Sequence, residues 1–260
     1  MSNLSSFTCA LVTGGGGGLG KAIASYLLGK GKKVIIAGRT EHTLRQTAQE
    51  IGATDYFVLD TGVNSQIPSF IQTLVTKYPE IDCLINNAGV QRPLQIVKDD
   101  PSDFLTKADQ EIDINIRGPM HLTLGLLEHF KSKESGVIMN VSSILAFVPF
   151  SVINPVYNGT KAWLHFWSMN LRTQLARAGY EKIKVVEIAP PSVGTDLHRD
   201  REDPDDNKKD KNPNALTVDE FMGFFSVGLE RGDDIIAPGL SQGVVDNWYK
   251  EFGPFYERLA

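Results

Sequence analysis

The segment Cys9-Ala-Leu-Val-Thr13-Gly14-Gly-Gly-Gly-Gly18-Leu-Gly20 carries the strongest structural signal of the chain. Its first five residues have the composition of a buried strand, and an amphipathic pattern over 20–30 predicts a helix after the glycines. Glycine lets a backbone turn tightly and approach a pyrophosphate, and a helix N-terminus offers free N–H groups and a positive dipole. The stretch fits both T-G-x-x-x-G-x-G and G-x-G-x-x-G. Its place between strand and helix favours a phosphate-binding turn over a merely flexible loop.

Short β-branched runs alternate with longer amphipathic segments along almost the whole chain. Near-continuous apolar strands separated by helices indicate a parallel sheet covered on both faces. We therefore expect one doubly wound α/β domain of the Rossmann type over residues 1–260, with about seven strands and with ligands at their carboxyl ends. The expected strands are 9–13, 33–37, 56–59, 82–86, 137–141, 184–188 and, more weakly, 234–237; the expected helices are 20–30, 41–51, 65–77, 104–131 and 157–178.

Composition and charge narrow the function classes. Of the residues, 42% are hydrophobic and 22% are charged, and the formal net charge is −5, which disfavours nucleic acid and anionic membranes as partners. No apolar run is long enough to span a bilayer, and residues 1–7 lack the basic start of a signal peptide. The two cysteines lie in apolar stretches, and the five histidines are scattered without metal-ligand spacing. A cytoplasmic protein without a metal is expected.

Residues 196–214 form the one abrupt change in composition. The segment carries charges of both signs and two prolines, and it has almost nothing to bury. A solvated surface insertion is the simpler interpretation. A lid is the alternative, because the segment follows a strand end where a ligand should lie.

The end of the second expected strand, Val34-Ile-Ile-Ala37-Gly38-Arg39-Thr40, bears on cofactor choice. A carboxylate at this position binds an adenosine ribose and repels a 2′-phosphate. Here Gly38 leaves room, and Arg39 supplies a guanidinium suited to phosphate. NADP(H) is therefore favoured over NAD(H).

A tyrosine four residues before a lysine places a phenol and an ammonium on one helix face, and a nearby cation favours phenolate. The pattern alone is weak because it occurs three times, at Tyr26/Lys30, Tyr157/Lys161 and Tyr180/Lys184. Only Tyr157 is preceded by a strand that ends in a pair of hydroxyls, Ser142-Ser143. Tyr157 is therefore the preferred candidate.

Five motifs occur in order along the chain: Thr13-Gly-x-x-x-Gly18-x-Gly20, Asn86-Asn-Ala-Gly89, Asn115, Ser143 and Tyr157-x-x-x-Lys161. Together they resemble the classical short-chain dehydrogenase/reductase family over nearly the whole chain. The segments 140–149 and 187–197 further resemble its DltE-like branch, a name that implies no substrate.

The resemblance implies an NADP(H)-dependent oxidoreductase that interconverts a carbonyl and an alcohol. Tyr157 would be the general acid in reduction and the base in oxidation, helped by Lys161 and the positive nicotinamide ring. Ser143 would donate to the substrate oxygen, and Asn115 would support a proton relay to Lys161. The residues implied to bind the cofactor are Thr13, Gly14, Gly16, Gly18, Leu19, Gly20, Arg39, Thr40, Asp60, Asn87, Ala88, Gly89, Asn115, Tyr157, Lys161, Pro190, Val193 and Thr195.

Three departures from the family pattern affect substrate geometry more than chemistry. Ser143 and Tyr157 are fourteen positions apart, about one more than usual, so Ser142 stays open as the hydroxyl donor although Ser143 is preferred. Pro191 and Ala146 stand where glycine is common. Three alternatives remain: an imine reductase, a redox-neutral lyase or cyclase on the same fold, and a non-catalytic NADP sensor. Family members are often homodimers or homotetramers, and the same is expected here.

Overall fold

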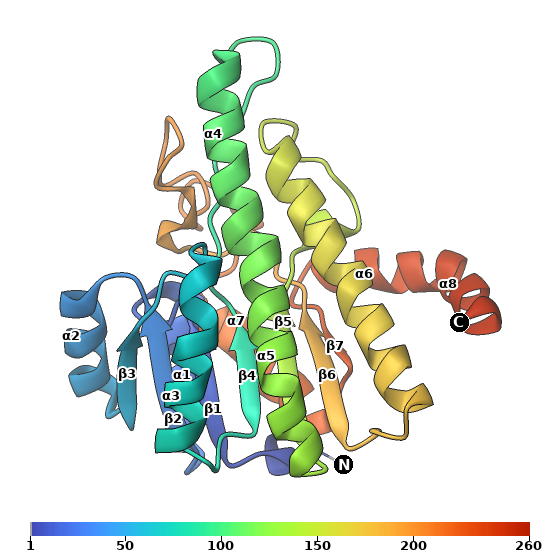
Figure 1. Ribbon diagram of the computed structural model, residues 1–260. Coiled ribbons are helices and arrows are strands. Elements are labelled where there is room, and N and C mark those ends of the chain that lie inside the picture. The colour runs from blue at the N-terminus through green and yellow to red at the C-terminus, as the bar shows by residue number, and fades with distance from the viewer. Residues whose placement is uncertain (1) are drawn as a thin grey trace.

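A seven-stranded parallel sheet organises residues 2–260, the part of the chain that the computed structural model describes (Figure 1). The strand order β3-β2-β1-β4-β5-β6-β7 is that of a doubly wound Rossmann fold, which confirms the predicted fold class. Met1 lies outside the described residues. The strands are β1 Cys9–Thr13, β2 Lys33–Gly38, β3 Asp55–Val58, β4 Cys83–Asn86, β5 Gly136–Val141, β6 Ile183–Ile188 and β7 Ile235–Ile236.

Helices cover both faces of this sheet, as a parallel sheet with crossover connections requires. Helices α3, α5 and α6 lie on one face, while α1 and α7 lie on the other (Figure 1). Their bounds are α1 Gly18–Gly29, α2 Glu41–Ile51, α3 Ile67–Lys77, α4 Pro101–Ile112, α5 Gly118–Ser132, α6 Pro155–Arg177, α7 Val218–Arg231 and α8 Ser241–Leu259.

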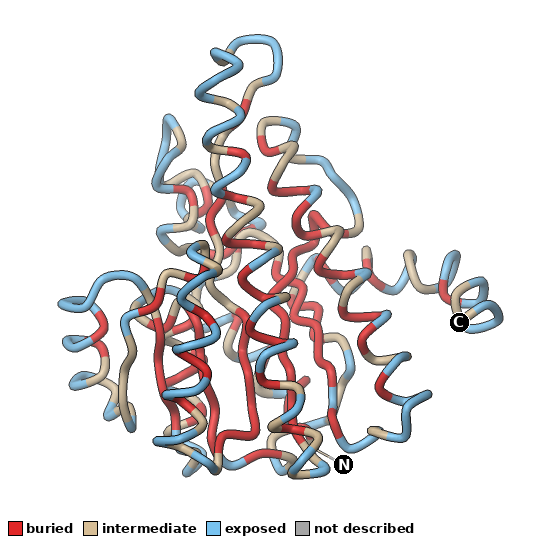
Figure 2. Tube along the Cα trace, in the orientation of Figure 1, coloured by how far each residue is buried: buried red, intermediate tan, exposed pale blue. Residues whose placement is uncertain are grey.

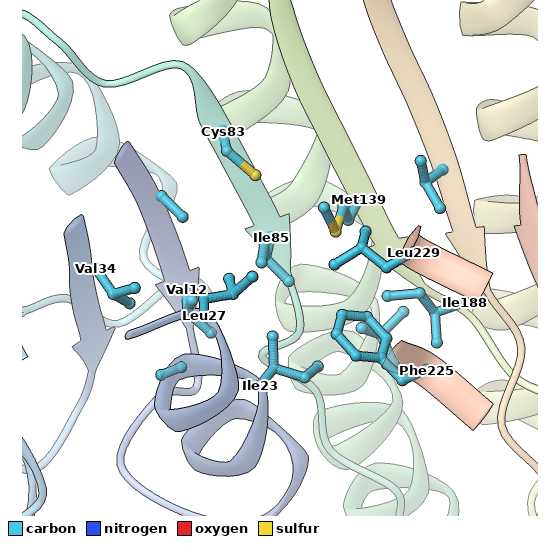
Figure 3. Close-up of a cluster of buried hydrophobic side chains, with 14 of the residues drawn as sticks. Val12, Ile23, Leu27, Val34, Cys83, Ile85, Met139, Ile188, Phe225 and Leu229 are labelled. Atoms are coloured by element: carbon cyan, nitrogen blue, oxygen red, sulfur yellow. The ribbon is translucent and has the colours of Figure 1, made fainter. Parts of the chain in front are cut away.

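Two hydrophobic clusters, one on each face, hold the layers together. Successive strand residues point to opposite faces, so Leu11 joins the cluster under α3 and α5 while Val12 joins the one under α1 and α7. Figure 3 shows the second cluster, in which Ile23 of α1 and Phe225 of α7 pack against the strands. The central strands are buried along their whole length (Figure 2).

The helix predicted over 104–131 is interrupted. Helix α4 ends at Ile112, a five-residue π-helical segment runs over Asp113–Arg117, and α5 begins at Gly118. A Cβ on Gly118 would lie 2.8 Å from the carbonyl oxygen of Thr61, so the helix passes too close to the neighbouring loop for any side chain there. Such π segments are frequent at functional sites.

Helices α7 and α8 were not among the expected elements. Helix α7 begins with a capping box, in which Thr217 and Glu220 each accept from the other's backbone N–H, and it ends at Gly232 with φ 88°. Helix α8 extends away from the sheet (Figure 1). No helix within residues 2–260 is long and apolar enough to cross a membrane.

Candidate active site

The glycine turn after β1 leaves a free helix N-terminus facing a cleft. Gly14 and Gly18 have φ angles of 66° and 50°, which residues with side chains rarely adopt. A Cβ on Gly20 would lie 2.3 Å from the carbonyl oxygen of Gly14, so this position also requires glycine. The residue before α1, Gly17, has no side chain to cap the first N–H groups of the helix. These groups therefore form a cradle that fits a pyrophosphate.

Thr13 and Asn87 join the ends of β1 and β4. The Thr13 hydroxyl accepts from the backbone N–H groups of Asn87 and Ala88, at 3.0 Å each, and the Asn87 side chain donates to the Thr13 carbonyl at 2.9 Å. Thr13 is almost completely buried. Its contacts hold the two neighbouring turns together rather than reaching into the cleft.

A cleft of about 310 Å³ opens along the carboxyl ends of the strands, where ligands of such folds bind. Most of the predicted site residues line it: Gly14, Gly18, Leu19, Arg39, Asp60, Asn87, Ala88, Gly89, Ser143, Tyr157, Lys161, Pro190, Val193 and Thr195. Five predicted residues do not line it: Thr13, Gly16, Gly20, Thr40 and Asn115. Of these five, Gly20 shapes the turn itself.

Tyr157 and Lys161 lie on the first turns of α6 and are 5% and 4% exposed. The ammonium lies 5.4 Å from the centre of the tyrosine ring and donates to the carbonyl of Val141 at 2.7 Å. Burial lowers the pKa of Lys161 to about 8, against a partial opposing effect of Glu111 and Glu187. Lys161 therefore exchanges protons much nearer to neutral pH than an ordinary lysine does.

Burial raises the pKa of Tyr157 above its usual value, and the charge of Glu111 raises it further. The Ser143 hydroxyl beside it and the charge of Arg201 act in the opposite direction. The sequence predicted a lowered pKa from Lys161 and from the nicotinamide ring. In the protein without a cofactor the shift has the opposite direction, because desolvation of the phenolate outweighs the lowering effects of Ser143 and Arg201 on the pKa of Tyr157.

The two adjacent serines have different partners. The Ser142 hydroxyl donates to the buried Glu187 carboxylate at 2.5 Å, and His165 contacts the other oxygen of Glu187 at 2.8 Å. The Ser143 oxygen accepts from the backbone N–H of Leu145 at 3.1 Å, which leaves its own O–H free to donate. Ser143 is therefore the better-placed donor for a substrate oxygen. Between Ser143 and α6, which begins at Pro155, lie a short 3-10 helix over Ile144–Ala146 and a loop.

Asn115 occupies the π-helical segment and is 1% exposed. Its side chain accepts from the N–H of Val90 at 3.0 Å and donates to the carbonyl of the same residue at 2.9 Å. It also donates to Thr160 of α6 at 3.2 Å. Asn115 thus connects the loop after β4 to the helix that carries Tyr157 and Lys161.

The other two tyrosine–lysine pairs lie outside the cleft. Tyr26 and Lys30 both bind Glu230 at the surface, at 3.0 and 2.7 Å. Tyr180 lies after the end of α6, while Lys184 is in β6, so these two share no helix face. Within residues 2–260, no group of acidic, histidine or cysteine side chains is arranged to hold a metal ion.

Two charged residues near the site were missed by the sequence analysis. Glu111 is fully buried in α4, one turn before Asn115. Arg201, in the 196–214 segment, donates to the side chains of Gln91 at 2.7 Å and Asn154 at 2.8 Å. The i, i+4 spacing of Glu111 and Asn115 was the available signal for the glutamate. Nothing in the sequence indicated the partners of Arg201.

Residues 8–206 match the profile of the short chain dehydrogenase family. The chain belongs to this family. A short-chain dehydrogenase is an oxidoreductase, and the ordered motifs and the fold agree with that assignment.

Among curated relatives of this short-chain dehydrogenase, the uncharacterized oxidoreductase DltE of Bacillus subtilis (strain 168) is 32% identical over 249 residues, which cover 96% of this chain and 95% of the relative. A short-chain dehydrogenase from Sphingobium yanoikuyae, solved with NADPH, has a TM-score of 0.82 and 22% identity, covering 97% of this chain and 95% of that one. A 3-ketoacyl-(acyl-carrier-protein) reductase from Brucella melitensis, solved with NADH, has a TM-score of 0.75 and 26% identity, covering 88% and 94%.

Proposed function

We propose that the chain is an NADP(H)-dependent oxidoreductase that interconverts a carbonyl and an alcohol, with Tyr157 as general acid and base. One observation carries the proposal. Ser143, Tyr157 and Lys161 line the same cleft as the phosphate-binding turn, so a dinucleotide bound on the turn reaches the three reactive side chains.

When bound, the nicotinamide cofactor supplies the hydride to the carbonyl carbon in reduction, or accepts it in oxidation. Ser143 donates its free O–H to the substrate oxygen and stabilises the negative charge that develops there. Tyr157 gives its phenolic proton to that oxygen. Lys161, whose pKa is lowered to about 8 by burial, stabilises the resulting phenolate and takes part in restoring its proton.

Two parts of the cleft are proposed to bind the cofactor. The α1 N-terminus and its glycines receive the pyrophosphate, and Asp60 and Arg39 lie toward the adenosine side. Arg39 is exposed at the end of β2, where an acid would select NAD(H). Its guanidinium favours the 2′-phosphate of NADP(H). The similar solved structures include complexes with NADPH and with NADH, so they favour neither cofactor. The proposed preference for NADP(H) therefore rests on Arg39.

The 196–214 segment is proposed as a lid over the substrate end of the cleft. Asp196, Leu197 and Arg199 line the cleft, and Arg201 joins the segment to residues on the other side. A closed lid excludes water from the reacting groups, which strengthens their electrostatic interactions.

The decisive experiment measures NADPH oxidation by the purified protein against a panel of ketones, aldehydes and imines. Wild-type turnover on a ketone or aldehyde that falls by at least about 10³-fold in Tyr157→Phe is expected, since the phenol supplies the proton. Unchanged turnover in Tyr157→Phe would contradict the proposal. Turnover on imines alone would favour an imine reductase. Product formed without net oxidation of NADPH would favour a redox-neutral lyase or cyclase, and NADPH binding without any turnover would favour a non-catalytic NADP sensor.

A further inference from the structure

Three buried polar side chains lie behind the reactive groups: Ser142, which follows β5, Glu187 of β6 and His165 of α6. The Ser142 hydroxyl donates to one carboxyl oxygen of Glu187 at 2.5 Å, and His165 Nδ1 lies 2.8 Å from the other. A carboxylate only accepts, so Nδ1 carries the proton and donates it. Glu187 and His165 are completely buried and do not line the cleft, so any part they play in the reaction passes through other residues.

Packing alone does not account for these polar side chains. Phe147 and Trp248 lie against the His165 ring, with ring centres at 4.3 and 4.7 Å, so an apolar ring would pack there as well. The Nε2 atom of His165 has no hydrogen-bond partner among residues 2–260, and a buried unpaired nitrogen costs free energy. Replacing a buried charged pair by apolar side chains is often neutral or stabilising. The contacts of Glu187 are therefore better explained by the geometry they impose than by stability.

The contacts of the three side chains close a ring with Lys161. The Lys161 ammonium donates to the carbonyl of Val141 at 2.7 Å, and Ser142 supplies the nitrogen of the same peptide unit. Ser142 contacts Glu187, Glu187 contacts His165, and His165 lies one turn after Lys161 on α6. Residues four apart on a helix share a face and lie about 6 Å apart along its axis. Two points of α6 are thus fixed against β5 and β6, so the helix can neither slide nor rotate freely.

The ring joins the two segments that carry the proposed reactive groups. Ser143 directly follows Ser142, and Tyr157 lies one turn before Lys161 on α6. A shift of α6 would move the Tyr157 phenol relative to the Ser143 hydroxyl, although both must reach the same substrate oxygen. A misplacement of about 1 Å is sufficient to slow a reaction by about 10²-fold.

We propose that Glu187 and His165 are positioning residues, which act through Ser142 and Lys161 to hold the Tyr157 phenol and the Ser143 hydroxyl at one substrate oxygen. The inference rests on the proposed function. No proton or electron passes through the ring, and neither residue touches the substrate. Their effect falls on kcat, because correct placement of the two hydroxyls matters most in the transition state.

The kinetic test compares two changes at one position. His165→Phe keeps a ring against Phe147 and Trp248 but removes the donor to Glu187. His165→Asn leaves a cavity but places an amide N–H where Nδ1 lies. In His165→Phe, kcat for carbonyl reduction should fall by about 10–30-fold, with the substrate KM and the Kd for NADPH within about threefold. His165→Asn should keep kcat within about threefold of the wild type, although its Tm falls further.

A role in stability alone predicts the reverse order, because the smaller side chain loses more packing. A kcat of His165→Phe within threefold of the wild type, or one no lower than that of His165→Asn, overturns the inference. Ser142→Ala opens the ring at a second point, and its kcat should fall by about 10-fold.

Ser168→Ala is the matched control in α6. Ser168 is also buried, and its hydroxyl oxygen accepts from the Asn140 side chain of β5 at 2.9 Å, but it lies outside the ring. Its loss should lower Tm and leave kcat within about twofold of the wild type. A fall in kcat as large as that of His165→Phe would show that any loosening of α6 slows the enzyme, which would refute a specific role of the ring.

A crystal structure of His165→Phe needs no turnover. The Lys161 ammonium should no longer lie within hydrogen-bond distance of the Val141 carbonyl, which it contacts at 2.7 Å in the wild type. An unchanged contact would overturn the inference. Should His165→Phe fail to fold, Glu187→Gln takes its place in both measurements with the same expected results, because glutamine offers one acceptor oxygen to the two donors.

The two proposals fail in different ways. If Tyr157→Phe abolishes turnover while His165→Phe keeps the wild-type kcat and the Lys161 contact, the proposed function stands and the positioning role is refuted. If Tyr157→Phe leaves turnover unchanged, the proposed function is refuted and the positioning role falls with it. The crystal structure then still reports whether the ring holds Lys161 in place.

Discussion

Ser142 and Ser143 differ in what their hydroxyls bind, although they are neighbours at the end of β5. Ser142 donates to a carboxylate that is itself buried, so its O–H is committed to the interior. The Ser143 oxygen accepts from the N–H of Leu145, and its hydroxyl lies beside the Tyr157 phenol in the cleft rather than on a buried carboxylate. A hydroxyl with a free proton is the one able to stabilise a developing oxyanion.

Exchanging each serine for alanine separates these roles. Ser143→Ala should lower kcat for carbonyl reduction by about 10²–10³-fold, since one oxyanion donor is removed, with little change in Tm. Ser142→Ala should instead lower the free energy of unfolding by about 1–3 kcal/mol, because Glu187 loses a donor inside the core. The measurements are steady-state kinetics and urea unfolding on both variants. A larger loss of kcat in Ser142→Ala than in Ser143→Ala would contradict the proposed role of Ser143 as the donor to the substrate oxygen.

Candidate site residues could be predicted from the sequence where they belong to an ordered motif. They could not be predicted where only tertiary contacts bring them to the site. Tyr157 could be chosen over Tyr26 because a strand with two hydroxyls precedes it, and the structure shows Tyr26 bound to Glu230 at the surface. The one signal for Glu111 was its i, i+4 spacing to Asn115, which does not indicate burial, since a glutamate in an amphipathic helix is normally solvent-exposed. Its burial depends on the approach of α6 and the loop that holds Arg92.

At the scale of elements, the close approach of α1 to the turn after β1 depends on Gly20. Gly20→Ala would bring a Cβ to 2.3 Å from the Gly14 carbonyl oxygen and 2.5 Å from the Asn87 side chain. The turn must then shift, so NADPH affinity should fall by at least about 10-fold, and stability should fall as well. Gly29→Ala, at the last residue of the same helix, meets nothing within 4 Å and should bind NADPH as the wild type does. Equal affinity of both variants, measured by fluorescence titration, would exclude the proposed cradle.

Arg201 joins the 196–214 segment, which we propose as a lid, to Gln91 and Asn154. Arg201→Ala removes the hydrogen bonds to Gln91 and Asn154 and the ion pair with Asp206. Hydrogen exchange in residues 196–214 should then become at least about 10-fold faster, and kcat should fall because the lid closes less firmly. Lys211→Ala breaks an exposed ion pair with Asp203 in the same segment and should change neither quantity. Exchange in Arg201→Ala equal to that in Lys211→Ala would argue against the lid.

Element boundaries were predicted well where apolar periodicity and glycine signals coincide, as for β1 and α2. The long helix over 104–131 was predicted without its π-helical segment, because periodicity over a few residues cannot distinguish a π turn from an α turn. The interruption arises from tertiary packing, where Gly118 passes against the Thr61 backbone. Asn115, a predicted site residue, lies in that segment, so its local backbone conformation was not predicted.

At the scale of the whole molecule, the sheet brings together residues that are far apart in the chain. The order β3-β2-β1-β4-β5-β6-β7 places the ends of β1 and β4 side by side. The turn after β1 thereby meets Asn87, and the loop after β5 meets the start of α6 at Tyr157. The alternation of strands and helices was sufficient to predict a parallel sheet whose carboxyl edge is expected to bind ligands, and the cleft lies at this edge. It was not sufficient to predict the contacts of Arg201 in the 196–214 segment with Gln91 and Asn154.

Cofactor binding should stabilise the whole fold, and the size of the effect reports the preference set by Arg39. A ligand at about 100 times its Kd stabilises a protein by about 2.7 kcal/mol, or about 5–10 °C in Tm for a domain of this size. NADPH should therefore raise Tm clearly more than NADH at equal concentration, because only NADPH offers the 2′-phosphate to the Arg39 guanidinium. Arg39→Asp should reverse the order, since a carboxylate repels that phosphate and accepts from the ribose hydroxyls. Arg45→Asp, an exposed arginine of α2 that does not line the cleft, is the matched control and should keep the wild-type order. If NADPH stabilises Arg39→Asp as strongly as it stabilises the wild type, another residue binds the 2′-phosphate, and the end of β2 does not decide the choice of cofactor.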